Sequence, residues 1–288
     1  MKSFLKKKLS SFILNSKRQY QKRNKQFFSR RFLYNPHTPI EDLDLSTISA
    51  FKKILKIKSG AVIDIGANIG QTLNNILFID EKIEYFGFEP QPYAAAILEI
   101  FIQENNLKNK SVIPIGLSDS FGIEDFYSFG EDFTNFYNTG ATIKKSFIPV
   151  QKLRTYKRKV ILEKGDDIIK KLKIDEISLI KVDVEGAEFR VIEGLKKTIK
   201  EKRPFLIFEM LPFFRTNIDK NDFVNECLRL LKKIESYNMA IYSILESDKT
   251  NSNSGINLLS PDDITLENNI KDFIAVPNEF ISEFKKYI

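Results

Sequence analysis

Short, continuous apolar runs that alternate with helix-like periodicity constrain the fold of this chain more than any other feature. The runs predict strands at residues 61–66, 83–90, 111–117, 177–184, 204–210, 240–245 and 272–277. Helical patterns predict helices at residues 46–58, 70–78, 93–105, 187–200 and 221–235. Strands that are apolar along their whole length are buried on both faces, which is typical of a parallel sheet. We therefore predict an α/β fold with helices on both faces of the sheet.

The chain has 288 residues, enough for one large α/β domain. It shows no internal repeat and no long linker, so we predict a domain at residues 46–288 after a basic helical arm at residues 1–45. No apolar run reaches the roughly 18 residues that a membrane span needs. The single cysteine, Cys227, excludes an intramolecular disulfide and a cysteine-based zinc site. It favours a reducing compartment, so we expect a cytoplasmic protein.

The positive charge of the chain belongs to the arm. Residues 1–31 carry 11 basic and no acidic residues, whereas the remainder carries 34 basic and 38 acidic residues. An apolar stripe also runs along the arm at helical spacing: Leu5, Leu9, Phe12 and Ile13. This pattern fits a helix that contacts an anionic membrane from the cytoplasmic side, a solvated basic helix that packs on the body, and, less well, an organellar presequence. We do not expect a nucleic-acid partner, because such proteins usually spread basic residues over the working face.

A glycine-rich turn, DIGANIG, follows the first predicted strand. Asp64 ends the strand, and Gly66, Asn68 and Gly70 follow at alternate positions. Ligands of open parallel sheets bind where such a turn meets the start of a helix. The spacing differs from the G-x-G-x-x-G of dinucleotide folds, so we predict a ligand with a positive centre and no pyrophosphate, S-adenosylmethionine (SAM). Glu89, 19 residues after Gly70, ends the second strand and can bind the two ribose hydroxyls.

Four more carboxylates lie at predicted strand ends. The stretch LIKVDVEGAEFRVIEG brings Asp183, Glu185 and Glu188 to the end of another apolar strand, and Glu209 ends the strand FLIFEM. An acidic residue in a first helical turn is favoured by the helix dipole, which by itself accounts for Glu188. Four carboxylates at one edge exceed what packing requires, so we predict that they include catalytic residues.

Five stretches together resemble the FkbM family of SAM-dependent methyltransferases: VIDIGANIGQT, FGFEPQP, GLSDSFG, IKVDVEGAE and RPFLIFEM. The resemblance covers about residues 60–211. It implies a Rossmann-like class I methyltransferase fold, with a seven-stranded, mostly parallel sheet whose last strand is antiparallel. It also implies methylation of a hydroxyl group, often on a sugar of a surface glycan or a related saccharide.

The resemblance also implies roles for particular residues. Asp64, Gly66, Ala67, Asn68 and Gly70 would hold the methionine part of SAM, and Glu89 would hold the ribose. Ser118 and Asp119, which end the third predicted strand, would lie near the adenine. Asp183 would face the reacting methyl group, with Glu185, Glu188 and Glu209 nearby.

The catalytic base is expected to be a carboxylate. The one histidine, His37, lies before the first core strand and outside every motif, so Asp183 is our choice of base. A divalent cation held by Asp183, Glu185 and Glu188 is an alternative that we do not favour. The other candidate functions are an RNA or protein methyltransferase on the same fold and a non-catalytic protein that binds SAM or a glycan.

The segment at residues 118–150 matches no motif and is rich in aromatic residues. We interpret it as a hairpin whose rings pack on the sheet. Its alternative role is to line an acceptor pocket or to form a lid.

Overall fold

The computed structural model describes residues 45–130, 141–147, 154–211, 213, 216–244, 256–258 and 272–287. All but the last residue of the predicted arm lies outside these ranges, as does His37, so both remain predictions from sequence. Among the described helices, none combines the length and the apolar character that crossing a membrane requires.

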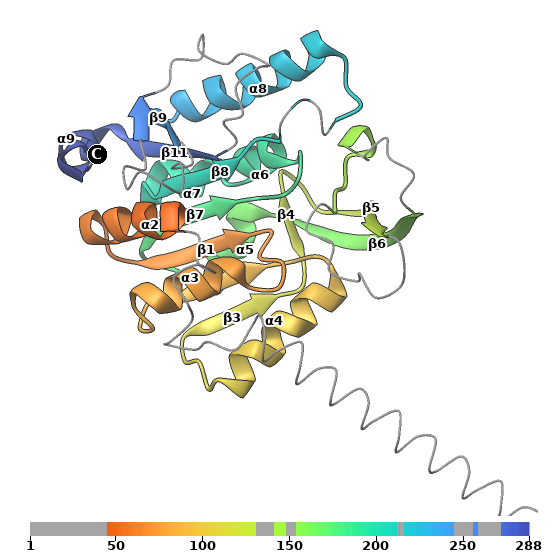
Figure 1. Cartoon of the computed structure of the whole chain (residues 1–288), viewed down its shortest axis with the longest axis horizontal. Coiled ribbons are helices and arrows are strands. Elements are labelled where there is room, and N and C mark those ends of the chain that lie inside the picture. Colours follow the sequence, from red (N-terminus) through yellow and green to blue (C-terminus); the bar gives the residue numbers. More distant parts are fainter. Residues whose placement is uncertain are drawn as a thin grey trace, which may run out of the picture.

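An eight-stranded sheet forms the centre of the molecule (Figure 1), in the order β10-β9-β11-β8-β7-β1-β2-β3. Its strands are β1 (Ala61–Ile65), β2 (Tyr85–Phe88), β3 (Lys110–Ile113), β7 (Ile177–Val182), β8 (Phe205–Glu209), β9 (Met239–Ile244), β10 (Ile256–Leu258) and β11 (Asp272–Pro277). Strand β11 runs antiparallel to both of its neighbours, β8 and β9. This confirms the predicted seven-stranded, mostly parallel sheet, to which the short antiparallel strand β10 adds an eighth strand at one edge.

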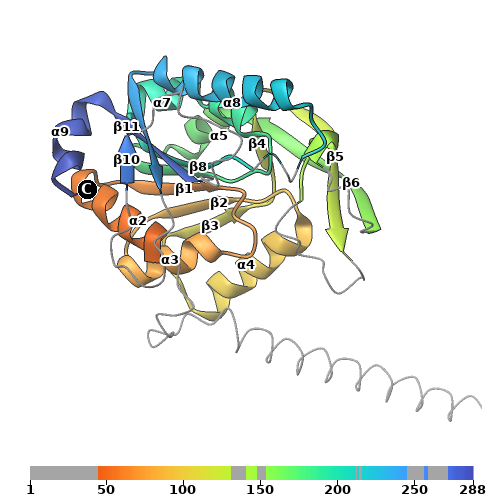
Figure 2. The same cartoon turned by 45° about the horizontal axis from the view of Figure 1, so that its top comes forward.

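Helices cover both faces of the sheet, as predicted (Figures 1 and 2). One face carries α2 (Leu45–Ile57), α3 (Gln71–Ile79), α4 (Pro92–Glu104) and the C-terminal α9 (Ile281–Phe284). The other carries α5 (Gly165–Leu172), α6 (Glu188–Gly194), α7 (Lys196–Lys202) and α8 (Lys220–Glu235). Because side chains alternate along a strand, Phe205 packs into the first layer and Leu206 into the second, and both are fully buried. Single 3₁₀ turns are η2 (Lys145–Phe147), η5 (Asn278–Phe280) and η6 (Lys285–Tyr287).

A second, three-stranded sheet was only partly foreseen from sequence. It consists of β4 (Gly116–Ser118), β5 (Gly122–Gly130) and β6 (Arg154–Lys164), in the order β4-β6-β5. The prediction of one strand at 111–117 was wrong. The strand of the main sheet ends at Ile113, and residues 116–118 pair with β6 in the second sheet. Pro114 explains the break, since proline has no N–H to donate to a ladder.

The predicted helix at 187–200 is two helices, α6 and α7, which meet at Leu195. The last residue of α6, Gly194, lies directly against β4. A Cβ atom at Gly194 would come within 1.8 Å of the carbonyl oxygen of Ser118. The glycine therefore lets the second sheet dock on the helices beside the main sheet.

Candidate active site

A cavity of about 570 Å³ opens at the carboxyl ends of β1, β2, β7 and β8. Its volume falls in the range of small-molecule sites. Eight of the residues predicted from sequence line it: Gly66, Ala67, Asn68, Gly70, Glu89, Asp183, Glu185 and Glu209. Four others lie outside this lining: Asp64, Ser118, Asp119 and Glu188. The carboxyl edge of the sheet therefore brings the two predicted motifs to one site.

The glycines of the first turn serve contacts within the protein. Gly66 and Gly70 have φ angles of 84° and 102°, which favour glycine, and Asn68 adopts φ 47°. A Cβ at Gly66 would lie 1.8 Å from the carbonyl oxygen of Asp183, and one at Gly70 would lie 2.7 Å from the side chain of Leu98. Both glycines also line the cavity, but these backbone angles and contacts by themselves require glycine. They let the turn pack against the β7 loop and against α4.

Asp64 lies beneath the turn and is fully buried. The hydroxyl of Tyr85, on the neighbouring strand β2, donates a 2.7 Å hydrogen bond to its Oδ2 atom. Burial raises the pKa of Asp64, while the nearby charge of Lys181 acts in the opposite direction. Asp64 therefore supports the floor of the site and does not form its surface.

Glu89 joins the two loops that frame one side of the cavity. Its Oε2 accepts the N–H of Asn68 at 2.9 Å, and its Oε1 accepts the N–H of Gln91 at 2.7 Å. Burial raises the pKa of Glu89 to about 7, although both hydrogen bonds act to lower it. A carboxylate has about four acceptor positions, so this group can still accept hydrogen bonds from a ligand.

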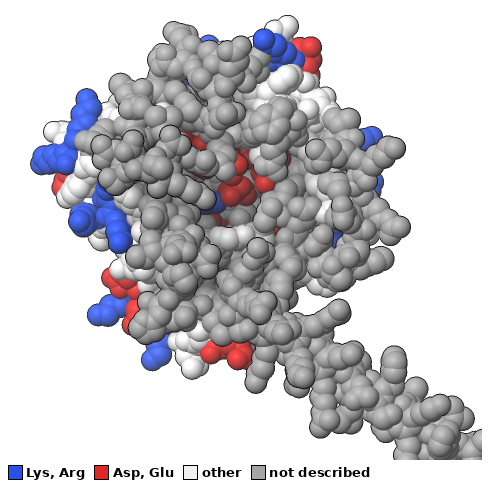
Figure 3. Space-filling model, viewed as in Figure 1, with Lys and Arg blue, Asp and Glu red and all other residues white. Residues whose placement is uncertain are grey.

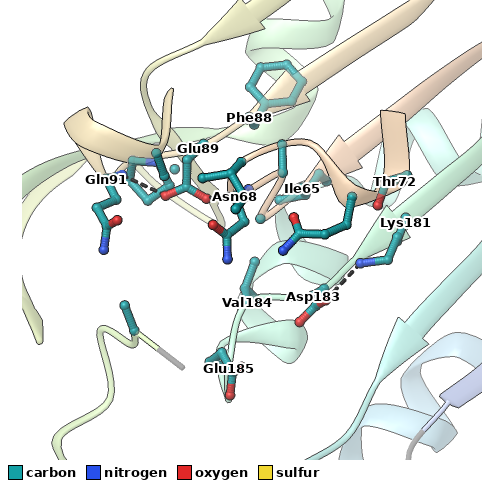
Figure 4. Close-up of a pocket in the computed structure, with 18 of the residues that line it drawn as sticks. Ile65, Asn68, Thr72, Phe88, Glu89, Gln91, Lys181, Asp183, Val184 and Glu185 are labelled. Atoms are coloured by element: carbon teal, nitrogen blue, oxygen red, sulfur yellow. Dashed lines mark hydrogen bonds and ion pairs between the residues drawn. The ribbon is translucent and has the colours of Figure 1, made fainter. Parts of the chain in front are cut away.

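Two buried amide oxygens on the same side lack a hydrogen-bond partner in the described part of the chain. They are Oδ1 of Asn68 and Oε1 of Gln91, and both residues line the cavity. Figure 4 shows the two side chains beside Glu89. Unpaired buried polar atoms carry a free-energy cost, so these oxygens suit a ligand rich in N–H and O–H donors. The donors of SAM, its amino groups and ribose hydroxyls, fit this acceptor set. Sequence reasoning missed Gln91, which only the fold brings next to Asn68.

Strand β7 and the loop that follows it supply the facing wall (Figure 4). The Nζ atom of Lys181 lies 2.8 Å from Oδ2 of Asp183. Although burial acts to lower it, the charges of Asp183, Asp64 and Glu209 raise the pKa of Lys181, which keeps the ammonium group charged. Sequence reasoning missed Lys181, but a single charge inside the apolar strand ISLIKV was a usable signal.

The loop after Asp183 is held from both sides. Glu185 has φ 53°, and its carbonyl oxygen accepts a 2.7 Å hydrogen bond from the hydroxyl of Thr142. Glu188 begins α6, is buried, and accepts the N–H of Gly186 at 2.9 Å. Burial raises the pKa of Glu188 to about 7. Glu188 thus stabilises the loop, in line with the non-catalytic interpretation of its position.

Ser118 and Asp119 follow β4 of the second sheet and lie outside the cavity lining. Ser118 is buried and donates to Asp119 at 3.1 Å. Asp119 also accepts a 3.1 Å hydrogen bond from Arg190 of α6, which binds Glu124 through two further hydrogen bonds. Burial acts to raise the pKa of Asp119, but the bonds and charge of Arg190 lower it overall. These contacts connect the second sheet to α6.

The second sheet and the segment before η2 contribute an apolar wall to the cavity: Phe126, Ala141, Ile143 and Leu162. The aromatic residues at 118–150 were predicted either to pack on the sheet or to line a pocket. Phe126 is buried and also lines the cavity. Phe147 packs against Gly186, and Phe121 is exposed. Phe133, Phe136 and Tyr137 lie outside the described residues.

The described residues include no cluster of three or more His, Cys, Asp or Glu side chains arranged to hold a metal ion. Glu188 lies behind the loop, so the set of Asp183, Glu185 and Glu188 does not converge on one point.

The chain is similar in sequence to known proteins. The family model of the methyltransferase FkbM domain matches residues 64–239, more than half of the chain. The 2-O-methyltransferase NoeI of Sinorhizobium fredii strain NGR234 is 29% identical over 160 residues, which cover 52% of this chain and 63% of NoeI.

The chain is also similar to solved structures. Methyltransferase FkbM from Methylobacillus flagellatus KT aligns with a TM-score of 0.44 and 16% identity over 75% of this chain and 43% of its own. Aeropyrum pernix fibrillarin, with natively bound SAM, aligns with a TM-score of 0.40 and 10% identity over 80% and 73%.

Proposed function

The chain belongs to the FkbM methyltransferase family, and from this premise we propose that it is a SAM-dependent O-methyltransferase acting on a hydroxyl group of a saccharide. The observation that carries the proposal is the pair of walls around one cavity. Acceptor atoms of Asn68, Glu89 and Gln91 form one wall, and Asp183 with its neighbours forms the other.

The first wall supports SAM as the methyl donor. Glu89 has free acceptor positions for two ribose hydroxyls, and the amide oxygens of Asn68 and Gln91 can accept from amino groups. When bound, SAM supplies a methyl group on a sulfonium centre. Isothermal titration with SAM tests this assignment, and absence of binding at millimolar SAM would refute it.

The second wall supports base catalysis by Asp183. Bringing acceptor and donor together in line is worth up to roughly 7–11 kcal/mol, and a positioned base adds about 10²- to 10⁴-fold in rate. In the proposed reaction the acceptor oxygen would form a bond to the methyl carbon while the bond from that carbon to the sulfonium sulfur would break, with S-adenosylhomocysteine as the leaving group. The hydroxyl proton would pass to the carboxylate of Asp183. Lys181, 2.8 Å from that carboxylate, stays charged and orients it.

Two observations support a saccharide as the methyl acceptor: the similarity to NoeI and the polar side chains that line the cavity. NoeI is described as a 2-O-methyltransferase. In this chain, Gln71, Asn74 and Glu209 join the cavity lining with groups that can bind hydroxyls. Glycans from cells lacking the protein should be lighter by the mass of one CH₂ group at one sugar. An unchanged glycan mass spectrum, together with methyl transfer to RNA or protein, would instead support the alternative acceptors.

A further inference from the structure

A tyrosine and an aspartate that the proposed reaction does not use lie beneath the site. Asp64 on β1 and Tyr85 on β2 are both fully buried. The hydroxyl of Tyr85 donates a 2.7 Å hydrogen bond to Oδ2 of Asp64, whereas Oδ1 has no hydrogen-bond partner in the part of the chain that the structure describes. A buried carboxylate that is only partly satisfied is costly, so it attracts any donor or cation within reach.

The cation beside this carboxylate is Lys181. It is the ladder partner of Asp64 on the neighbouring strand β7, so the two side chains leave the sheet on the same face. Burial raises the pKa of Asp64, against which Lys181, Tyr85 and Thr72 act. The ammonium group nevertheless bonds Asp183, at 2.8 Å, and among the charges that act on it those of Asp183 and Asp64 exceed that of Glu209. Two carboxylates, one in the site and one beneath it, therefore compete for one ammonium group.

The sheet leaves space for the tyrosine hydroxyl to reach Asp64. Gly87 is the partner of Asp64 on β2, and a Cβ atom there would lie 2.8 Å from the hydroxyl oxygen of Tyr85. Two residues before Asp64 and Lys181, the same face of the sheet is apolar, at Val62 and Leu179. Packing in this layer requires a ring but no hydroxyl, so the hydrogen bond to Asp64 is what distinguishes tyrosine from phenylalanine here.

We propose that Tyr85 is a positioning residue: by satisfying Asp64, its hydroxyl leaves Lys181 to hold the carboxylate of Asp183. The inference rests on the proposed function, because it concerns the proposed base. Figure 3 shows acidic side chains and a basic one together in a hollow of the face turned to the viewer, and Figure 4 shows Lys181 paired with Asp183. Without the hydroxyl, Asp64 would draw Lys181 away from the site, and Asp183 would lose the partner that orients it.

Tyr85→Phe removes the hydroxyl and keeps the ring. With the full-length chain, saturating SAM and a methyl glycoside of glucose, galactose or mannose as acceptor, we expect kcat to fall roughly tenfold, as for coupled neighbours. The affinity for SAM, measured by titration calorimetry, should stay close to that of the wild type. Tyr242→Phe is the matched control, because Tyr242 is buried in the same layer and its hydroxyl has no hydrogen-bond partner among the described residues. An unchanged kcat in Tyr85→Phe, or the same fall in both variants, would overturn the inference.

Neutralising Asp64 separates positioning from packing. Asp64→Asn removes the competing charge but keeps an oxygen that can accept from Tyr85. In that background Tyr85→Phe should lower kcat much less than it does in the wild type, because no second carboxylate competes for Lys181. The same fold loss in both backgrounds would show that Tyr85 acts through packing alone, and would overturn the inference.

A crystal structure of Tyr85→Phe tests the inference without turnover. We expect Nζ of Lys181 to leave its 2.8 Å contact with Asp183 and to lie within hydrogen-bond distance of Asp64. An unchanged contact would overturn the inference and leave the proposed function standing. A wild type that binds no SAM would instead refute the proposed function, and the position of Lys181 in the two proteins would still decide the role of Tyr85.

Discussion

Gly66 and Asp183, which directly follow the strands β1 and β7, are in direct backbone contact. A Cβ on Gly66 would lie 1.8 Å from the carbonyl oxygen of Asp183, and the N–H of Asp183 donates to the carbonyl of Ile65 at 2.9 Å. The turn after β1 and the loop after β7 are therefore held in a fixed position relative to each other. This contact fixes the distance between the wall that would bind SAM and the carboxylate that would act as base.

Replacing Gly66 by alanine should destabilise the protein. The φ angle of 84° disfavours alanine, and the new methyl group would overlap the Asp183 backbone, so we expect a loss of roughly 2–4 kcal/mol in the free energy of unfolding. Urea denaturation measures it. Gly122→Ala is the matched control, since its Cβ would meet nothing closer than 3.7 Å. Equal stabilities of the two variants would contradict the contact.

Asp183→Asn should remove turnover while leaving SAM binding nearly intact. The amide cannot take up the acceptor proton, so kcat should fall by about 10²- to 10⁴-fold. Titration calorimetry gives the SAM affinity, and release of S-adenosylhomocysteine gives the rate. Asp167→Asn on the exposed side of α5 serves as control. Full activity of the Asp183 variant would eliminate this residue as the base.

SAM affinity should rise between about pH 6 and pH 8 through Glu89. Its pKa of about 7 means that the carboxyl is partly protonated in the free protein, and the ribose hydroxyls donate best to the ionised form. Binding at pH 6.5 should therefore release protons, which calorimetry in buffers of different ionisation enthalpy detects. Glu89→Gln should lose this component, whereas Glu201→Gln, exposed on α7, should keep it. The same proton release in both variants would disprove the assignment.

The raised pKa of Glu188 predicts a change of stability with pH. Since the folded state holds the proton more tightly than the unfolded state, stability is full below the unfolded pKa and is lost as the pH rises through about 7. Glu188→Gln should flatten this dependence in urea denaturation between pH 5 and pH 8, compared with Glu201→Gln. A slope unchanged from wild type would show that Glu188 does not titrate in this range.

Thr142→Val should slow catalysis without changing the affinity for SAM. The hydroxyl of Thr142 is the donor to the carbonyl oxygen of Glu185, and its loss leaves that carbonyl short of a partner at a cost of about 1–3 kcal/mol. We expect kcat to fall while SAM affinity is kept. Thr155→Val, at an exposed position on β6, is the control. A fall in SAM affinity with unchanged kcat would be the opposite of what this contact predicts.

The sequence by itself determined the sheet and the approximate edge of the site. The mainly apolar runs AVIDI and FLIFE predicted strands, because a strand of a parallel sheet is buried on both faces. The turn at Gly66, the acid at Glu89 and the carboxylate at Asp183 all follow such strands. Parallel strands end at one edge, so these residues had to lie close together.

Only the tertiary structure decided which of the acidic residues face the cavity. Asp64 and Glu188 carry the same chemistry as Glu89 and Asp183, yet one lies beneath the turn and the other behind the loop. The same holds for Lys181, whose partner is known only once the side chains are placed, and for Asp119, which is bound by Arg190 of α6. The physical reason is that strand order and spacing follow from local hydrophobic patterns, whereas the burial and partners of a charged side chain depend on residues far away in the chain.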